Sequence, residues 1–221
     1  GYQVELDNKF KIPLTFAWGM TETTALGTIN RGQDYLDRPN SSGLSIPDLT
    51  EIAVIDNDWK FLATGEIGEI VFKSPSNTKG YLKNKEETDK TIQNGWLKTG
   101  DLGYLDEDGY LYIVDRKKDM IITGGYNVYP AEIERVIAAN PKVALAAVGK
   151  QNDELKGEIA KAYIVLKEGE QASEEEMIAF CREELAAYKC PRKIQFVPDV
   201  PKTSTGKIMR RELNTLDHLG E

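Results

Sequence analysis

The sequence W-L-K-T-G-D at residues 96–101 is the stretch around which the chain is organised. It leads into two apolar-rich runs separated by the acidic, Gly-containing loop at residues 106–109, a pattern typical of a β-hairpin. Asp101 follows Thr-Gly, a turn setting from which we expect an exposed carboxylate. Arg116 lies at the far end of the hairpin, so a carboxylate and a guanidinium could grip one polar ligand from two sides. Taken by itself, the pattern also fits an acidic turn followed by a solvated run of charges.

The same stretch continues to residue 134 as W-L-K-T-G-D-L-G-Y-L-D-E-D-G-Y-L-Y-I-V-D-R-K-K-D-M-I-I-T-G-G-Y-N-V-Y-P-A-E-I-E. Two shorter motifs accompany it, W-G-M-T-E-T-T at residues 18–24 and P-K-T-S-T-G-K-I at residues 201–208. Together they resemble the adenylate-forming superfamily, which includes acyl-CoA synthetases, peptide-synthetase adenylation domains and firefly luciferase. The motifs occur in the family's order and cover the chain nearly from end to end. The resemblance is therefore specific, and it favours the acyl-CoA synthetase type.

The resemblance implies an α+β fold in which a β-rich, barrel-like remnant of a large N-terminal domain precedes a small α+β C-terminal domain. We place the C-terminal part of the large domain at residues 1–115, a hinge at 116–118 and the small mobile domain at 119–221. Family members carry a Ser/Thr/Gly-rich phosphate loop upstream of the Thr-Glu motif, and nothing in residues 1–17 resembles it. We therefore expect the C-terminal portion of a larger ligase, with exposed apolar surface in its first segment and no activity alone.

Periodicity, turn residues and capping patterns predict the individual elements. In the first segment we expect three strands and a helix, at residues 11–16, 51–56, 69–73 and 86–92. In the second we expect a helix opened by Pro130, a helix after the capping box at residues 173–176 and a last helix at 208–213. The strands expected there lie at residues 120–123, 143–148, 159–166 and 194–197. The helix after the capping box should bury one face, formed by Met177, Cys181 and Leu185.

The composition is that of a globular protein without a membrane segment. The 221 residues are 40% hydrophobic, and no run approaches the ~18 consecutive apolar residues of a membrane helix. Cys181 and Cys190 fit no metal-binding or redox spacing, so we expect ordinary thiols in a cytoplasmic protein. The net charge of −8 argues against a nucleic-acid partner. Basic residues dominate the stretch 187–211, which could attract the phosphates of a small ligand or form a solvated face.

The resemblance assigns five residues to ATP and its metal ion. Thr21 and Glu22 should face the phosphates, and Glu22 should hold Mg²⁺, which prefers hard carboxylate oxygens. Trp18 stands where most family members have Tyr, beside the adenine of ATP or AMP; the alternative for this indole is a position in the core. Asp101 should accept hydrogen bonds from the ribose hydroxyls, and Arg116 should contact ribose or phosphate.

Four further residues belong, by resemblance, to the moving parts of the reaction. Lys207 is the lysine that bridges the incoming carboxylate and the α-phosphate of ATP during adenylation. Lys118 is the hinge residue about which the small domain turns before the thiol attacks. Gly124 and Gly125 should line the path of the pantetheine arm of coenzyme A, because they lack side chains. Without the resemblance, these residues would read as exposed lysines and ordinary glycine turns.

The sequence thus predicts part of an ATP-dependent, AMP-forming acid–CoA ligase that acts on a fatty or aryl carboxylic acid. The alternative within enzymes is an adenylation domain that loads a carrier protein. The alternative outside enzymes is a non-catalytic nucleotide-binding or interaction module, which the missing phosphate loop favours. The partners implied are a small carboxylic acid, CoA and the upstream part of the same enzyme, and a homo-oligomer remains open.

Overall fold

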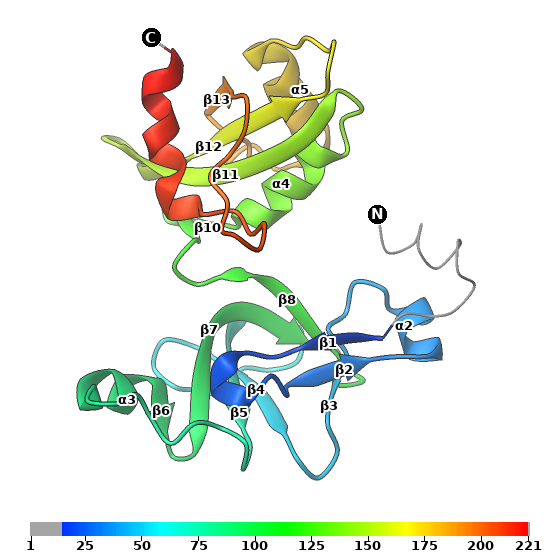
Figure 1. The fold of residues 1–221 in the computed structure, drawn as a ribbon, viewed down its shortest axis with the longest axis vertical. Coiled ribbons are helices and arrows are strands. Elements are labelled where there is room, and N and C mark those ends of the chain that lie inside the picture. The colour runs from blue at the N-terminus through cyan, green and yellow to red at the C-terminus, as the bar shows by residue number, and fades with distance from the viewer. Residues whose placement is uncertain (1–14, 221) are drawn as a thin grey trace. The chain divides into compact units, whose positions relative to one another are not determined.

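The computed structural model describes residues 15–220, and it divides into two compact units between Lys117 and Lys118 (Figure 1). Unit 1 comprises residues 1–117, and unit 2 comprises residues 118–221. The strand expected at residues 11–16 falls mostly outside the described residues, and the first described strand starts at Phe16. No helix in the described part of the chain is long and apolar enough to cross a membrane.

Unit 1 is built on a five-stranded antiparallel sheet whose central strand carries the W-L-K-T-G-D sequence. This strand, β7 (Trp96–Leu105), is hydrogen-bonded to three others. They are β5 (Gly68–Lys73), β6 (Ile92–Gln93) and β8 (Leu111–Arg116), and β4 (Glu51–Ile55) extends the sheet beyond β5. The core under the sheet is apolar and fully buried, with Ile70, Phe72 and Leu111 at its centre.

A second, three-stranded sheet closes unit 1 into a barrel-like shape. It consists of β1 (Phe16–Trp18), β2 (Thr28–Asn30) and β3 (Leu44–Ser45). Backbone hydrogen bonds join it to the start of β8, where Leu111 donates to the Gly43 carbonyl at 3.0 Å. The predicted fold class, a β-rich barrel-like segment followed by a small α+β domain, is confirmed.

The hairpin of β7 and β8 was predicted correctly, but the exposure of Asp101 was not. The turn at residues 106–109 is closed by the Asp106 N–H, which donates to the Tyr110 carbonyl at 3.0 Å. Asp101 lies inside β7 and is only 7% exposed. The strand does not end at Thr-Gly, because β7 pairs with β5 both before and after Gly100, and the positive φ of 73° at this glycine falls where the register of the pairing shifts. The prediction of an exposed carboxylate was therefore wrong.

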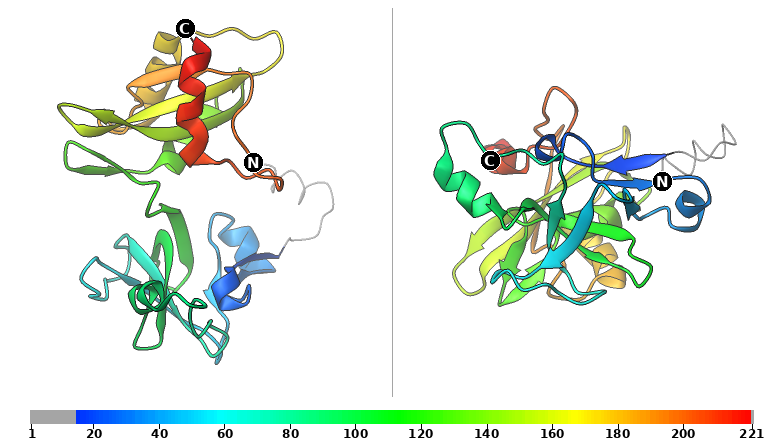
Figure 2. Two further views of the ribbon diagram at one scale, coloured as in Figure 1. Left: turned by 60° about the vertical axis from the view of Figure 1, so that its left-hand side comes forward. Right: turned by 90° about the horizontal axis from the view of Figure 1, so that it is seen from below.

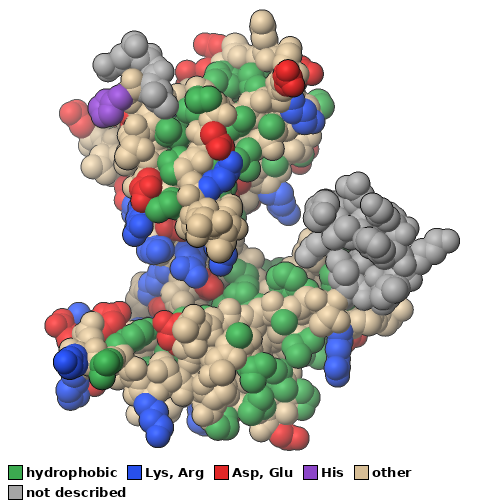
Figure 3. Space-filling view, in the orientation of Figure 1, with side chains coloured by type: hydrophobic (Ala, Val, Ile, Leu, Met, Phe, Trp, Pro, Cys, Tyr) green, Lys and Arg blue, Asp and Glu red, His purple; other side chains and the backbone are tan. Residues whose placement is uncertain are grey.

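The helices of unit 1 are short and lie at its periphery. They are η1 (Thr21–Thr23), α2 (Gln33–Asp37) and α3 (Lys85–Thr91). The cap of α3 is Asn84, whose side chain accepts the Glu87 N–H at 3.1 Å. Unit 1 also exposes large apolar side chains, and green side chains are visible on its surface in Figure 3. The described ones are Phe16, Leu26, Leu36, Phe61, Ile67 and Leu82.

Unit 2 contains a second five-stranded sheet, in the order β10-β9-β12-β11 with β13 parallel to β12. The long hairpin of β11 (Val143–Asp153) and β12 (Gly157–Leu166) forms most of it. The shorter strands are β9 (Ile121–Thr123), β10 (Tyr126–Val128) and β13 (Lys193–Phe196). The predicted strands are all present, whereas β10 was not expected and β11 is longer than predicted.

Helices cover the two faces of this sheet differently, as Figures 1 and 2 show. On one face, α4 (Pro130–Ala138) and α5 (Glu174–Glu184) pack on alternate residues of β11 and β12. On the other face lies η2 (Arg210–Gly220), which contributes the buried Leu213. The Pro130 start was predicted, and Ser173 caps α5 by accepting the Glu176 N–H at 3.2 Å. The last helix begins later and is longer than expected.

The buried face predicted for the second helix is confirmed, since Met177, Cys181 and Leu185 are 1%, 0% and 7% exposed. The opposite core is smaller and centres on Tyr163 and Leu213. Leu213 stands over Gly149, where an added methyl group would lie 3.3 Å from a Leu213 methyl carbon. Leu213 thus packs η2 on the sheet, and polar contacts reinforce this packing, since Asp217 accepts hydrogen bonds from the Lys161 ammonium at 2.6 Å and the Tyr163 hydroxyl at 2.7 Å.

We predict that Leu213→Ala lowers the free energy of unfolding of unit 2 by about 2–5 kcal/mol, because it removes a fully buried side chain and leaves a cavity. The matched control is Leu155→Ala, since Leu155 is 96% exposed in the same unit. Urea unfolding followed by far-UV circular dichroism measures the unfolding free energy of each variant. Equal stability of the two variants would show that η2 is not packed as described.

Candidate functional site

Asp101 and Arg116 face each other across the β7–β8 ladder, where they are directly paired. The Arg116 Nε lies 3.0 Å from the Asp101 Oδ1. Its N–H is not aligned for a hydrogen bond, so Oδ1 is a buried acceptor without a hydrogen-bonded donor among the described residues. The Arg116 side chain is 57% exposed, whereas that of Asp101 is 11% exposed. This geometry presents a buried carboxylate that can accept hydrogen bonds from a ligand.

The electrostatic environment of Asp101 is a balance between burial and nearby groups. Burial raises the pKa of Asp101 above its ordinary value, because the charged form loses solvation. The charge of Arg116 opposes this rise most strongly, and the Trp18 indole opposes it to a smaller extent. Asp115 adds to the rise. A donor from a bound molecule would therefore stabilise the carboxylate that folding has desolvated.

Trp18 lies at the end of β1 and is half-buried. Its ring stacks on Phe72 with centroids 5.1 Å apart and an angle of 30° between the planes. The core position considered as the alternative thus describes one side of this indole. The Trp18 indole also lowers the pKa of Asp101 through a hydrogen bond. Trp18 is therefore both a core residue and a neighbour of the candidate site.

The Thr21–Glu22 turn follows β1 and is held by a separate loop. The Thr78 N–H donates to the Glu22 carbonyl at 2.7 Å, and the Thr24 hydroxyl donates to the Ser76 carbonyl at 2.9 Å. Thr24 adopts a positive φ of 55°, a conformation that non-glycine residues reach only where the surroundings impose it. Thr21 is exposed and Glu22 is half-buried. The turn is therefore rigid, with both side chains at its surface.

Tyr81, which contacts Glu22, was not identified from the sequence. The Tyr81 hydroxyl donates to the Glu22 Oε1 at 3.1 Å. Burial, and then the hydrogen bond to Glu22, raise the pKa of Tyr81, so the phenol stays protonated and acts as a donor. Tyr81 belongs to the loop before α3, about sixty residues from Glu22 in sequence, and no short-range pattern could have joined them.

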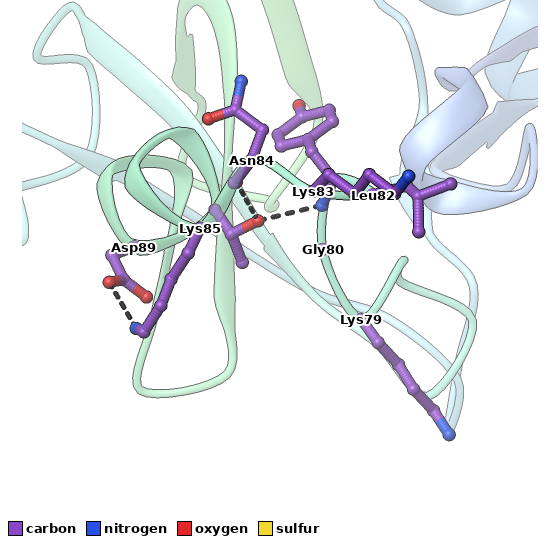
Figure 4. Close-up of a pocket in the computed structure, with 9 residues that line it drawn as sticks. Lys79, Gly80, Leu82, Lys83, Asn84, Lys85 and Asp89 are labelled. Atoms are coloured by element: carbon purple, nitrogen blue, oxygen red, sulfur yellow. Dashed lines mark hydrogen bonds and ion pairs between the residues drawn. The ribbon is translucent and has the colours of Figure 1, made fainter.

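Tyr81 also lines a shallow hollow between the loop at residues 79–85 and the first turn of α3 (Figure 4). The Thr88 hydroxyl accepts the Tyr81 N–H at 2.9 Å, and Lys85 is paired with Asp89 at 2.6 Å. The Lys83 and Leu82 side chains point away from these bonds, as Figure 4 shows. None of the predicted site residues lines this hollow.

In unit 2, Lys207 lies at the end of a small hairpin in the loop between β13 and η2. The Thr203 N–H donates to the Lys207 carbonyl at 2.8 Å, and the Lys207 N–H donates to the Thr203 hydroxyl at 3.1 Å. Gly206 completes the turn with a φ of 82°. The Lys207 side chain is exposed and has no ion-pair partner among the described residues. A rigid backbone thus carries a mobile ammonium group.

The other predicted residues of unit 2 lie in turns. Lys118 is exposed in the turn between the two units' adjoining strands. Gly124 and Gly125 form the β9–β10 turn with positive φ values of 56° and 86°. A methyl group added at either glycine would meet no atom within 4 Å, so conformation rather than crowding calls for glycine here.

The basic stretch at residues 187–211 is largely neutralised in the structure by acidic residues, several of them from elsewhere in unit 2. Lys189 pairs with Glu132 at 2.8 Å, and Arg210 pairs with Glu134 at 2.7 Å. Lys202 pairs with Asp199. These paired residues are therefore not free to bind phosphates, whereas Arg192, Lys193 and Lys207 are exposed and have no ion-pair partner among the described residues.

Two family models match the chain. The model for AMP-binding enzymes matches residues 3–82, and the model for the C-terminal domain of AMP-binding enzymes matches residues 132–207. Together they cover more than half of the chain, in the order that the motifs predict. The chain belongs to the adenylate-forming family of AMP-binding enzymes. The predicted resemblance is confirmed.

Several curated relatives are 2-succinylbenzoate–CoA ligases. The ligase of Bacillus cytotoxicus is 42% identical over 205 residues, which are 93% of this chain and 42% of that protein. The ligase of Geobacillus kaustophilus is 43% identical over 205 residues, 93% of this chain and 41% of that protein. The chain of this family member thus spans about two fifths of the length of the relatives it matches.

Solved structures give the same picture. The o-succinylbenzoate CoA synthetase of Bacillus subtilis, in complex with the acyl-adenylate intermediate OSB-AMP, is 36% identical with a TM-score of 0.87. The match covers 95% of this chain and 43% of that one. The ATP-bound MatB of Rhodopseudomonas palustris is 35% identical with a TM-score of 0.89, over 99% of this chain and 44% of that one.

We predict that Asp101→Asn makes unit 1 more stable than the wild type at neutral pH, because the amide carries no charge to desolvate. Since folding raises the pKa of Asp101, the wild type is most stable when this carboxyl is protonated and loses that contribution as the pH rises through the folded pKa. The gain in unfolding free energy should therefore shrink as the pH falls towards the ordinary value of 3.8. Urea unfolding of both proteins between pH 3.5 and 7 measures this gain, and each unit by which folding raises the pKa corresponds to about 1.4 kcal/mol.

The matched control is Asp58→Asn, which removes an exposed carboxylate in a loop of the same unit. An identical pH response of the two variants would contradict the burial of Asp101.

Proposed function

We propose that this chain is part of an ATP-dependent, AMP-forming acid–CoA ligase that activates a carboxylic acid as an acyl-adenylate and transfers the acyl group to CoA. The observation that carries the proposal is the buried acceptor of Asp101 beside Arg116, in a chain 42% identical to 2-succinylbenzoate–CoA ligases over 93% of its length. The relatives are more than twice as long, and the exposed apolar side chains of unit 1 suit a surface that an upstream segment covers.

The ribose of ATP fits the Asp101 environment. A carboxylate offers two oxygens to two vicinal hydroxyls, and ionised acceptors make the stronger hydrogen bonds. The orphaned, buried Oδ1 gains a donor in this arrangement. Arg116 is exposed enough to reach ribose or phosphate without leaving the strand. Trp18 presents the side of its ring not packed on Phe72 to the adenine.

The Thr21–Glu22 turn fits the phosphates and Mg²⁺. No cluster of three or more potential ligands occurs among the described residues, so Glu22 is the single protein carboxylate proposed for the ion. One carboxylate together with substrate phosphates is the usual way in which proteins bind Mg²⁺. When bound, the ion neutralises charge on the phosphates. Tyr81 holds the Glu22 carboxylate in place, and the exposed Thr21 hydroxyl can donate to a phosphate oxygen.

Lys207 supports the first half-reaction. Its ammonium group can contact both the attacking carboxylate and the α-phosphate while negative charge develops between them. The hairpin backbone keeps the residue in place, and the exposed side chain supplies the reach. Removing one such preorganised contact typically costs ~10²–10³ in rate.

The second half-reaction requires the lysine to leave, and we propose that unit 2 turns about Lys118 for this purpose. In this proposal, residues 1–115 are the end of the large domain, residues 116–118 are the hinge, and residues 119–221 are the small mobile domain. The division of the chain into compact units beside Lys118 supports this assignment. Gly124 and Gly125, with open space where side chains would be, suit the path of the pantetheine arm.

We propose an aryl acid as the substrate, because the named relatives act on 2-succinylbenzoate. A fatty acid remains the alternative to be compared. Loading of a carrier protein is the second candidate function. It differs from the first only in the thiol that accepts the acyl group, which belongs to the carrier protein and not to CoA. A panel with 2-succinylbenzoate, benzoate and fatty acids, each tested with CoA and with carrier protein, separates these possibilities.

We predict that the complete protein, which joins this chain to the upstream segment of its relatives, releases pyrophosphate from ATP and Mg²⁺ with an aryl acid. Lys207→Ala should lower the rate of adenylate formation by ~10²–10³, because the charge developing on the α-phosphate loses its partner. The same variant should form thioester from supplied acyl-adenylate at nearly the wild-type rate.

The control for that experiment is Lys202→Ala, which removes an exposed lysine of the same hairpin that is paired with Asp199. The absence of acid-dependent pyrophosphate release would disprove the ligase. Equal losses in both half-reactions would disprove the role of Lys207 alone. This chain without the upstream segment should release none.

We predict that Lys118→Pro lowers the rate of thioester formation while adenylation survives, because proline fixes one of the backbone angles that a rotation must change. Lys118→Ala keeps those angles free and serves as the control. Rapid-quench measurement of each half-reaction compares the two variants. Normal overall turnover of Lys118→Pro would show that Lys118 is not the hinge.

The proposal also concerns the cellular location and the oligomeric state of the protein. Both cysteines are buried free thiols, which suits a reducing compartment such as the cytoplasm. Cell fractionation tests this location. Self-association stays open, and size-exclusion chromatography with light scattering decides it.

A further inference from the structure

Arg210 stands three residues after Lys207 and is the most extensively paired arginine described in unit 2. Its Nε lies 3.2 Å from the Glu134 Oε1, and its Nη2 lies 2.7 Å from the Glu134 Oε2. The third nitrogen, Nη1, lies 3.4 Å from the Asp119 Oδ2. The fork of the guanidinium thus binds both oxygens of one carboxylate and reaches a second carboxylate with the remaining nitrogen.

This cluster is partly protected from solvent. The side chains of Arg210, Glu134 and Asp119 are 22%, 15% and 17% exposed. Charged pairs that are withdrawn from water in this way are less screened by salt and more costly to break than surface pairs. The cluster is therefore a fixed connection rather than a transient surface contact.

The two carboxylate partners of Arg210 connect it to different parts of unit 2. Glu134 belongs to α4, and its Oε1 also accepts the Val148 N–H at 2.8 Å, which ties α4 to β11. Asp119 is the first residue after Lys118. Arg210 thus links the chain just after Lys207 both to the helix and sheet of unit 2 and to the segment that follows the proposed hinge.

The hairpin that carries Lys207 has internal hydrogen bonds but needs an anchor at its base. An isolated bridge joins Lys202 to Ile208, and the Met209 N–H donates to the Pro201 carbonyl at 2.8 Å. Residues 202–207 are exposed, so packing does little to orient them. Val200 and Ile208, on the two sides of the hairpin base, pack against the core around Tyr163 and Leu213. The first side chain beyond the hairpin with ion pairs to the rest of unit 2 is Arg210.

We infer that Arg210 is a positioning residue for Lys207. It makes the hairpin a rigid extension of α4 and of the segment after Lys118, so that the ammonium group is delivered to the same place each time unit 2 turns. The inference rests on the proposed function, because it concerns the lysine of the adenylation half-reaction. It assigns to Arg210 an effect on chemistry although the residue itself touches no substrate.

The neighbouring arginine provides a matched control. Arg211 is 79% exposed, and its one described ion pair is with the adjacent Glu212 at 3.5 Å. Both residues carry the same charge and lie in the same turn of η2. A loss that follows from charge or composition alone would appear in both variants, whereas a loss of positioning would appear only at Arg210.

The first experiment compares Arg210→Lys with Arg211→Lys in the complete protein. Lysine keeps the charge, but its donors share one nitrogen, so it cannot reproduce the planar fork in which three separate nitrogens meet Glu134 and Asp119. We expect Arg210→Lys to slow adenylate formation about 10²-fold, the effect typical of a reacting group displaced by about 1 Å. Thioester formation from supplied acyl-adenylate should stay within about twofold of the wild type, as should both half-reactions of Arg211→Lys.

A second pair of variants separates positioning from stability. Arg210→Met combined with Glu134→Gln removes the guanidinium without leaving the Glu134 charge buried and unpaired. We expect this double variant to melt close to the wild type and still to lose adenylation selectively. Equal losses in both half-reactions, or a loss that tracks the melting temperature, would overturn the inference and leave Arg210 as a purely structural residue.

A third measurement does not depend on catalysis. Amide hydrogen exchange of this chain should become faster at residues 203–208 in Arg210→Lys, and not in Arg211→Lys, because the hairpin loses its anchor. Unchanged exchange would overturn the inference even in an active ligase. If the complete protein forms no adenylate, the proposed function fails, and the exchange experiment still decides whether Arg210 holds the hairpin.

Discussion

The pairing of Asp101 with Arg116 across β7 and β8 is the constraint on which the rest of unit 1 depends. An acidic side chain is buried in a central strand only where partners offset the loss of solvation. Arg116 does this in part, since its Nε lies 3.0 Å away but is not aligned for a hydrogen bond. The strand therefore holds a carboxylate whose hydrogen-bonding capacity is left for a ligand, and the adjoining sheets position Trp18 beside it.

The two residues that flank Lys118 show how a hinge can be confined to one position. Lys117 is tied to unit 1, because its Nζ lies 2.9 Å from the Glu69 Oε2 and its N–H donates to the Gly100 carbonyl. Asp119 is tied to unit 2 through Arg210. Each unit thus holds its own end of the connection. The rotation proposed above would therefore concentrate its change of backbone angles at Lys118, as hinge movements usually do at a few residues.

The Thr21–Glu22 turn illustrates how distant segments build one site. Its backbone is held by Thr78 and Ser76, and its carboxylate is held by Tyr81. These residues come from a loop more than fifty positions further along the chain. The positive φ at Thr24 is sustained by these bonds, since nothing in the local sequence favours it. A local motif therefore marks this candidate site, and non-local hydrogen bonds give the turn its shape.

The sequence by itself determined the β7–β8 hairpin, the Pro130 and Ser173 helix starts and the buried face of α5, because these depend on local turn chemistry, capping and periodicity. The family and the fold class followed from the resemblance of three motifs to the adenylate-forming superfamily. The candidate residues also came from short motifs. Only the tertiary structure decided that Asp101 is buried, because the path of β7 through Gly100 is set by pairing with β5 and β8. The contacts of Tyr81 with Glu22 and of Arg210 with Glu134 and Asp119 were equally out of reach of the sequence, because each joins residues that only folding brings together.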